Sequence, residues 1–392
     1  MKLFVLVTLV SVAFGKNLPN QNARISKMVT TYGYPLETYK VTTDDGYLLD
    51  LFRIPHGIQN KNQHDSQRPA VLLMHGFLSC CEDFVAGGPS QGLAFYLADK
   101  GYDVYLGNSR GSPYGQQHTS LDPHKDAAFW RFSFHEIGVA DMAAIIDQVV
   151  SISQQNKIHY VGHMEGATVF YILASQKKGY NNKIEKMASL GPIAYLKKAP
   201  HQILKKIAEN YKSKSWVIKN VGMSTFNPSS ELTSEAQNQC SNLEQKEQIC
   251  RNDYFLFNGY NSKNFNETTI QDVVSRRPCL GSVRQVLHLA QMKDSGRFES
   301  YTFPEKTDSY EYDLSQVSAP VAIFYTPEDA LSHVDDVDAL AKQLPNVYKK
   351  EVESDFTNNL DFLYAENIYK FYKYVTESFQ EDQRKRNTNM LF

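Results

Sequence analysis

One stretch decides the fold of this chain: Ile158-His159-Tyr160-Val161-Gly162-His163-Met164-Glu165-Gly166. It begins with a short apolar run and ends in a turn that has a glycine at each end, and residues 167–175 then have a helical pattern. A strand, a sharp turn and a helix in this order are the setting of the nucleophile elbow G-x-S-x-G, whose middle residue is exposed at the top of a parallel sheet. On these residues alone, an ordinary glycine-bounded turn between a strand and a helix fits about as well.

Several other apolar runs predict the remaining strands. Each run is short and most end at Gly, Pro or Asn, and helical periodicity follows, for example over 137–151, which is typical of a mostly parallel sheet covered on both faces. An antiparallel hairpin at the sheet edge is predicted from 38–41 and 47–54, joined across Asp44-Asp45-Gly46. The runs expected to form buried parallel strands are 69–74, 101–106, 157–161 and 319–325.

The first residues predict export. Lys2 precedes an apolar run over 3–14, and Ala13-Phe14-Gly15 places small residues where a signal peptidase cleaves. A membrane anchor is the alternative, but the run is too short for a bilayer core that needs roughly 20 residues. We therefore expect residues 1–15 to be a signal peptide and the mature protein to be secreted, extracellular or in the lysosomal lumen.

The rest of the chain divides into a core interrupted by an insertion. The stretch 193–304 is polar and mostly helical in period, and it breaks the alternation of strand and helix. We interpret it as a helical cap or lid inserted between a first part of the core, 16–192, and a second part, 305–380. The charged residues 381–392 are expected to form a frayed tail.

Five cysteines leave at least one unpaired in an exported chain. Cys240 and Cys250 lie in a polar stretch, where a disulfide would restrain weakly packed backbone, so we predict that they pair. Cys80, Cys81 and Cys279 are expected to be buried free thiols. Asn266-Glu267-Thr268 is an N-glycosylation sequon, which predicts a glycan on Asn266.

Composition excludes several classes of function. The chain has 392 residues and a formal net charge of −2, so it offers no basic face for a nucleic acid. No cluster has the ligand spacing of a zinc or calcium site, and no glycine-rich loop is suited to a phosphate. We therefore expect no cofactor, no metal and no nucleic-acid partner.

Ordered motifs over nearly all of the mature chain resemble the acid lipases, the gastric, lysosomal and insect lipase-3-like family. This resemblance implies an α/β-hydrolase core, a mostly helical cap and hydrolysis of triacylglycerols or cholesteryl esters. The motifs are Tyr32-Gly33-Tyr34-Pro35, Asp44-Asp45-Gly46-Tyr47-Leu48-Leu49, Arg53-Ile54-Pro55, His75-Gly76-Phe77-Leu78, Gly107-Asn108-Ser109-Arg110-Gly111, Phe129-Trp130-Arg131-Phe132-Ser133, Val286-Leu287-His288-Leu289-Ala290-Gln291 and Asn359-Leu360-Asp361-Phe362.

The resemblance places the family's catalytic triad on three positions of this chain. The nucleophilic serine falls on Met164, inside the elbow formed by Gly162, His163 and Gly166, and the base histidine falls on Asn359. The acid is kept as Asp329. The oxyanion hole is implied to use the backbone N–H groups of Phe77 and Glu165, which survive changes of side chain.

The replacements at two of the three triad positions remove the chemistry. A thioether has no proton to lose and forms no stable acyl-enzyme, so Met164 is not a nucleophile. The carboxamide of Asn359 does not titrate near neutral pH and cannot take a proton from an attacking group. Loss of either group in a comparable triad costs on the order of 10⁶-fold in turnover, and loss of both costs little more because they act as a unit.

These substitutions favour an inactive lipase homologue that keeps an apolar pocket for a lipid or fatty-acyl ligand, with transient contact to lipid surfaces. One alternative is an active ester hydrolase that uses a non-standard set drawn from His163, Glu165, His333 or the thiols of Cys80 and Cys81. Another is a secreted storage or partner-binding protein that inherited the fold with its cleft filled.

Overall fold

The computed structural model describes residues 21–60, 68–243, 246–260, 264–275, 279–303, 308–352 and 355–389. Its centre is a nine-stranded sheet in the order β1-β2-β4-β3-β6-β7-β8-β9, with β5 paired to β2. From β3 to β9 all neighbouring strands are parallel. The predicted mostly parallel α/β sheet is therefore confirmed.

The strands expected from the apolar runs are present, with boundaries shifted by a few residues. They are β3 (Ala70–Met74), β4 (Asp103–Leu106), β6 (Ile158–His163) and β8 (Val321–Tyr325), and every residue in them is buried. The predicted hairpin is formed by β1 (Glu37–Thr42) and β2 (Tyr47–Ile54), which pair antiparallel and join the sheet through β4.

Three strands are absent from the sequence-based expectation. The buried strand β7 (Ile184–Leu190) carries Glu185 and Lys186, so its sequence lacks a continuous apolar run. The edge strand β9 (Val347–Glu351) leaves its residues half-buried or exposed, and β5 (Gln117–His118) has only two residues. Strands β9 and β5 bury little of their side chains, so their sequences lack the hydrophobic pattern that identifies a strand.

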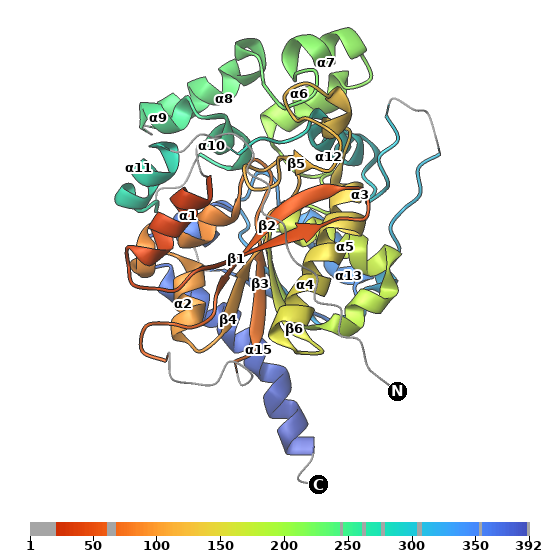
Figure 1. The fold of residues 1–392 in the computed structure, drawn as a ribbon. Helices are drawn as coiled ribbons and strands as arrows, with labels where there is room; N and C mark the ends of the chain where they lie inside the picture. The colour runs from red at the N-terminus through yellow and green to blue at the C-terminus, as the bar shows by residue number, and fades with distance from the viewer. Residues whose placement is uncertain are drawn as a thin grey trace.

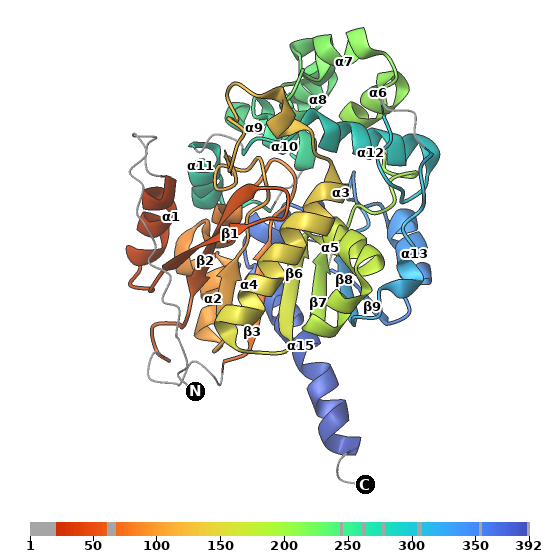
Figure 2. The same cartoon turned by 45° about the vertical axis from the view of Figure 1, so that its right-hand side comes forward.

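Helices cover both faces of the sheet (Figure 2). On one face α2 (Leu93–Asp99) packs against α15 (Tyr369–Asn389), and on the other the π-helical segment that leads into α4 (Ala143–Ser153) packs against α5 (Glu165–Gln176). The helix expected over 137–151 begins as a short α3 (Phe134–Glu136), continues as one π-helical segment (Ile137–Met142) and then becomes α4.

The π-helical segment holds a buried charge centre. The Arg110 guanidinium donates from Nε to Asp141 at 2.7 Å and from Nη1 to Asp45 at 2.6 Å, and it lies 3.9 Å from the centre of the Tyr47 ring. Asp141 lies in the π-helical segment, Asp45 in the hairpin turn, and Arg110 after β4. This pairing fixes the edge of the sheet against the helix layer that also contains α5.

The inserted stretch lies between β7 and β8 in the chain, and its helices gather at one end of the sheet (Figure 1). They are α6 (Gln202–Asn210), α7 (Lys214–Asn220), α8 (Ser230–Asn242), α9 (Glu247–Cys250), α10 (Asp253–Asn258), α11 (Glu267–Ser275) and α12 (Val283–Ser295). We call this group the cap. Its helical content agrees with the character expected for 193–304.

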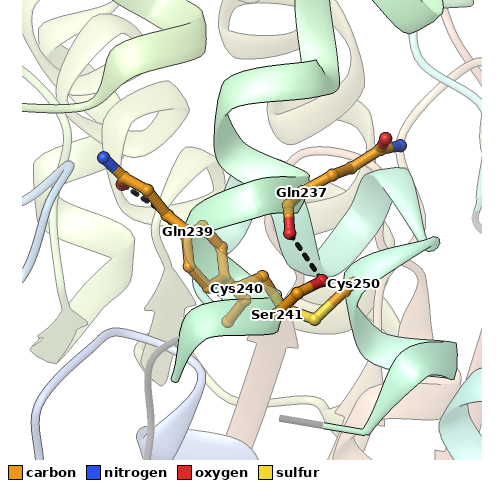
Figure 3. Close-up of a disulfide and its surroundings, with 6 residues drawn as sticks. Gln237, Gln239, Cys240, Ser241 and Cys250 are labelled. Atoms are coloured by element: carbon orange, nitrogen blue, oxygen red, sulfur yellow. Dashed lines mark hydrogen bonds between the residues drawn. A yellow bond between two sulfur atoms is a disulfide. The ribbon is translucent and has the colours of Figure 1, made fainter. Parts of the chain in front are cut away.

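A disulfide lies inside the cap, as predicted. Cys240 at the end of α8 is bonded to Cys250 at the end of α9, with their Cα atoms 5.5 Å apart (Figure 3). Cys80, Cys81 and Cys279 are buried free thiols in this structure.

Two expectations concern the ends of the chain, the signal peptide and the frayed tail. Residues 1–15, the predicted signal peptide, lie outside the described residues. Helix α15 extends to Asn389, through most of the polar stretch for which we expected a frayed tail. Its Glu, Gln, Lys and Arg residues are good helix formers. Our expectation of a frayed tail gave this helix propensity too little weight.

The glycine at the start of α5 yields a test of the fold. A Cβ at Gly166 would lie 2.3 Å from the Met74 carbonyl oxygen, which is backbone and cannot move aside, whereas a Cβ at Gly179 meets nothing within 4 Å. We expect Gly166→Ala to lower the free energy of unfolding by about 2 kcal/mol or more, and Gly179→Ala to change it little. Urea unfolding followed by circular dichroism measures both; equal effects would contradict the packing described here.

Candidate functional site

Met164 occupies the middle of a sharp turn between β6 and α5. Its φ of 47° and ψ of −106° are rare for a residue with a side chain, and they place it in the strained conformation of a nucleophile elbow. The backbone holds this conformation, because the Met164 N–H donates to the Leu190 carbonyl at 2.9 Å and the Met164 carbonyl accepts from Ala167 N–H at 3.0 Å.

The two glycines of the elbow are required by close backbone contacts. A Cβ at Gly162 would lie 2.5 Å from the Ala167 nitrogen, and one at Gly166 would meet the end of β3. Gly76 is also close, since a Cβ there would lie 3.4 Å from the Met164 Cβ. These contacts bring the loop after β3, which contains Phe77, beside the start of α5.

The Met164 side chain is 1% exposed. A thioether in this place supplies apolar, polarizable surface and accepts hydrogen bonds only weakly. The position from which a serine would attack is therefore occupied by a buried apolar group.

Asp329 and Asn359 lie together, as the family pattern implies for an acid and a base. Asn359 Nδ2 is 3.4 Å from Asp329 Oδ1 and donates to the Asn258 carbonyl at 2.7 Å. Asp329 Oδ1 also accepts from the backbone N–H groups of Leu331 and Ser332 at 2.7 and 2.8 Å. The structure thus brings the acid position and the base position together from two separate loops.

The electrostatics of this pair differ from those of an acid and a histidine. Burial raises the pKa of the Asp329 carboxyl, and the neighbouring amide and N–H groups offset only part of that rise. Within the described part of the chain, Asp329 Oδ2 and Asn359 Oδ1 are both acceptors without a donor. Asn359 carries no charge that could balance a buried Asp329 carboxylate, so burial favours the protonated acid.

His163 contacts a backbone group of the Asn359 loop. Its Nε2 lies 2.9 Å from the Asn359 carbonyl oxygen, so Nε2 carries the hydrogen. Burial lowers the pKa of His163 to about 4, so the ring is neutral near neutral pH. The contact ties the elbow to the Asn359 loop and leaves His163 poorly placed as a base.

Glu165 forms a buried link to the cap. Gln285 on α12 donates from Nε2 to Glu165 Oε2 at 2.8 Å, and Gln285 Oε1 accepts from Ser282 N–H at 2.7 Å. Ser282 Oγ donates to the Trp130 carbonyl at 2.7 Å. Burial raises the pKa of Glu165 to about 8, so this carboxyl is mainly protonated at neutral pH.

Phe77 also joins the core to the cap. Its ring lies 5.3 Å from that of Phe257 and 5.8 Å from that of Phe226, both in the cap, and a Cβ at Gly281 would lie 2.2 Å from it. Asn258 Nδ2 donates to the Phe77 carbonyl at 3.1 Å. The cap is therefore closed over the loop that carries the predicted oxyanion donor.

A pocket of about 240 Å³ opens between cap helices α6, α8 and α10 and the loops of the acid and base positions. Its wall is largely apolar, with polar side chains from both the cap and the core. The lining residues are Pro200, His201, Gln202, Ile203, Ala236, Gln239, Leu243, Leu256, Asn258, Gly259, Tyr260, Ala330 and Asn358.

The other candidate residues lie in structural positions. His333 caps α13 (Val334–Gln343) by accepting from Asp335 N–H at 3.2 Å. Cys80 and Cys81 are buried, and burial raises the pKa of both thiols, which disfavours the thiolate that a nucleophile needs. No metal-binding cluster of His, Cys, Asp and Glu occurs among the residues that the structure describes.

Asn266 is half-buried at the start of α11. Its Oδ1 accepts from Thr269 N–H at 3.0 Å and caps that helix. A glycan on Asn266 stays a prediction.

Two residues of this site carried no signal in the sequence. Asn258 contacts Asn359 through its carbonyl and Phe77 through its amide, and Gln285 holds Glu165. Both lie in cap helices that follow the elbow in the chain, Asn258 94 residues and Gln285 121 residues after Met164. Spacing along the chain does not reveal such contacts, because they depend on how the cap settles on the core.

This sheet, elbow and inserted cap define the α/β-hydrolase class, and comparison with known proteins agrees. A family model described as "alpha/beta hydrolase fold" matches residues 69–363, and one described as "Partial alpha/beta-hydrolase lipase region" matches residues 25–88. A solved esterase from Thermogutta terrifontis superposes with a TM-score of 0.51 at 15% identity, covering 88% of this chain and 98% of that one. A putative aryl esterase from Burkholderia cenocepacia gives 0.52 at 15% identity, over 88% of this chain and 100% of that one.

The sequence relatives are more specific. The chain is 34% identical to gastric triacylglycerol lipase of Mus musculus over 90% of both chains. It is 33% identical to gastric triacylglycerol lipase of Homo sapiens over 95% of both, and 33% identical to Lipase 1 of Drosophila melanogaster over 88% of this chain and 77% of that one. The chain belongs to the acid lipase family.

The unpaired carboxyl at the acid position gives a testable pH dependence. Because the pKa of Asp329 is higher in the folded state than in the unfolded state, the folded protein binds the proton more tightly, and stability falls as pH rises through the folded value. Asp329→Asn keeps the size of the side chain and removes its charge. We expect this variant to match or exceed the parent in stability at neutral pH, by on the order of 1 kcal/mol for each unit by which the pKa is raised.

Urea unfolding between pH 4 and pH 8 (about the range in which a buried carboxyl titrates) measures the difference. The gap between Asp329→Asn and the parent should widen as pH rises, whereas Asp355→Asn, at an exposed carboxylate, should give no such trend. A variant that is less stable than the parent at every pH would refute this account of the pair.

Proposed function

We propose that this member of the acid lipase family is an exported protein that binds a lipid beneath its cap and does not hydrolyse esters by the triad mechanism. The observation that carries the proposal is the pairing of a buried Met164 at the elbow with Asn359 beside Asp329. A lipase fold with its cap in place therefore lacks both groups that start the reaction.

The chemical argument concerns proton transfer. Acylation needs an O–H or S–H nucleophile whose proton passes to a base within hydrogen-bond reach. Met164 has no such proton, Asn359 accepts none near neutral pH, and His163 is bonded to the Asn359 carbonyl. The predicted backbone donors at Phe77 and Glu165 alone would leave about 10³- to 10⁴-fold acceleration over water.

The pocket under the cap supports binding. It is lined mainly by apolar side chains and adjoins the acid and base loops through Ala330 and Asn358. Two of its lining residues, Gln202 and Asn258, carry buried side-chain oxygens that have no donor within the described residues. An apolar chain whose head donates a hydrogen bond, such as a fatty alcohol, a sterol or a protonated fatty acid, would satisfy them, whereas an ester head would not.

Export is supported by the predicted signal peptide at 1–15 and by the disulfide between Cys240 and Cys250, because disulfides persist in oxidising compartments. Along the described chain, no helix has the length and apolar character needed to span a bilayer. Relatives in the same family are named as triacylglycerol lipases, so the proposed ligand class is acyl lipid and related apolar alcohols.

Restoring the triad tests the proposed inactivity. We expect the parent to hydrolyse a short-chain chromogenic ester no faster than Asp329→Asn, and the double variant Met164→Ser with Asn359→His to gain at least about 10²-fold, because it regains nucleophile and base together. Initial rates at several substrate concentrations measure the gain.

The two single variants are the matched controls. Each should stay near the parent rate, since a serine without its base, or a base without its serine, recovers little. Parent turnover that is well above background and insensitive to changes at Met164 and Asn359 would refute inactivity and favour a non-standard catalytic set.

Binding is tested separately by displacement of a fluorescent apolar probe. We expect a long-chain alcohol to displace the probe about tenfold more tightly than the methyl ester of the same chain length, because one hydrogen bond to a buried acceptor is worth roughly 1.4 kcal/mol. Ala236→Phe, on the pocket wall, should weaken displacement, and Ala208→Phe on α6, which does not line the pocket, should not. Probe that is not bound at all would favour a scaffold with a filled cleft.

A further inference from the structure

A small depression lies between the core and the cap and is lined by residues of both. Its lining includes Leu78, Ser79 and Cys80 from the loop after β3, and Val273 and Cys279 from the cap. The carboxyl groups of Glu82 and Asp83 face the same space. Neither thiol takes part in the proposed ligand binding.

The two thiols interact directly. A side-chain hydrogen bond links Cys80 and Cys279, and the residues are 2% and 7% exposed. Cys81 is placed differently, because its N–H donates to Asn108 Oδ1 at 3.1 Å and its thiol also interacts with Asn108. Of the two adjacent cysteines, the structure therefore selects Cys80 as the partner of Cys279.

The surroundings of Cys80 and Cys279 disfavour ionisation of both thiols. Asp83 Oδ2 accepts from Ser79 Oγ and from the Tyr254 hydroxyl, the latter at 3.3 Å, so the carboxylate is held beside the sulfurs. Burial is the main cause that raises the pKa of both thiols, and Glu82 and Asp83 raise it further. A disulfide would replace two buried thiols whose ionisation this environment disfavours.

We propose that Cys80 and Cys279 form a disulfide that fastens the cap to the core. The proposal rests on export as proposed above, since an oxidising compartment supplies the oxidant, a low-molecular-weight or protein disulfide. Before the cap closes on the core during folding, while the thiols are open to solvent, Cys279 attacks this disulfide as a thiolate and releases one reduced thiol. Cys80 then attacks the mixed disulfide and releases the second, so two cysteine thiols and one disulfide become one protein disulfide and two thiols.

The proposed bond differs from the first disulfide in the parts of the protein that it would join. Cys240–Cys250 joins helices within the cap, whereas Cys80–Cys279 would join the cap to the loop that bears Phe77. Cys279 is two residues before Gly281, whose backbone packs on the Phe77 ring. A covalent bond here would hold α12, with Gln285 and its contact to Glu165, in the closed arrangement.

Thiol counting on the full exported chain tests the assignment without reference to lipid or ester. The protein is equilibrated in a mixed oxidised and reduced glutathione buffer, then denatured and alkylated without further reduction, and its peptides are mapped by mass spectrometry. We expect Cys81 as the alkylated cysteine and a peptide that links residues 80 and 279. Because the parent protein is used, the result does not depend on a variant that folds.

Two variants complete the test. Cys81→Ser should retain the linked peptide and leave no cysteine to alkylate, whereas Cys80→Ser should leave Cys279 alkylated. Alkylation of Cys80 and Cys279 in the parent, or a linkage that uses Cys81, would overturn the proposal. Because none of these readouts involves binding or turnover, failure here would leave the proposed function standing, and the reverse also holds.

Discussion

The structure depends on the close approach of the first turn of α5 to the end of β3. Gly166 lies against the Met74 carbonyl and Gly162 against the Ala167 nitrogen, and no side chain fits at either place. This contact forces the residue between them into a positive φ, which Met164 adopts although it has a side chain. The elbow geometry is therefore present with Met164 at its centre, because the packing of the sheet and helix requires it.

The same packing explains why the remaining polar groups stay in place. Asp329 is held by two backbone N–H groups from its own loop, and Asn359 by the carbonyl of Asn258 and the imidazole of His163. Asn359 has no charge to pair with the buried Asp329 carboxyl, and burial raises the pKa of that carboxyl. The raised pKa of Asp329 favours its neutral form, beside the neutral amide of Asn359 and the neutral ring of His163.

The cap contributes the contacts that turn this site into a closed region. Phe77 packs with two aromatic rings of the cap, and the protonated Glu165 accepts from Gln285 on α12. A disulfide between Cys80 and Cys279 would act on the same boundary. Core and cap are therefore joined around the predicted oxyanion loop by apolar packing and hydrogen bonding, and under our proposal also by a covalent bond.

The sequence by itself determined the class of the fold, the four apolar strands with the edge hairpin, the elbow, the inserted cap and its disulfide, since these follow from local patterns and from ordered family motifs. It missed β7, because Glu185 and Lys186 interrupt the apolar pattern of a buried strand, and β9, because an edge strand has little to bury. Only the tertiary structure decided that Asn258 and Gln285 complete the site and that Cys80, not Cys81, faces Cys279. Those pairings join residues distant in the chain, and they depend on how the cap rests on the core, which no local pattern encodes.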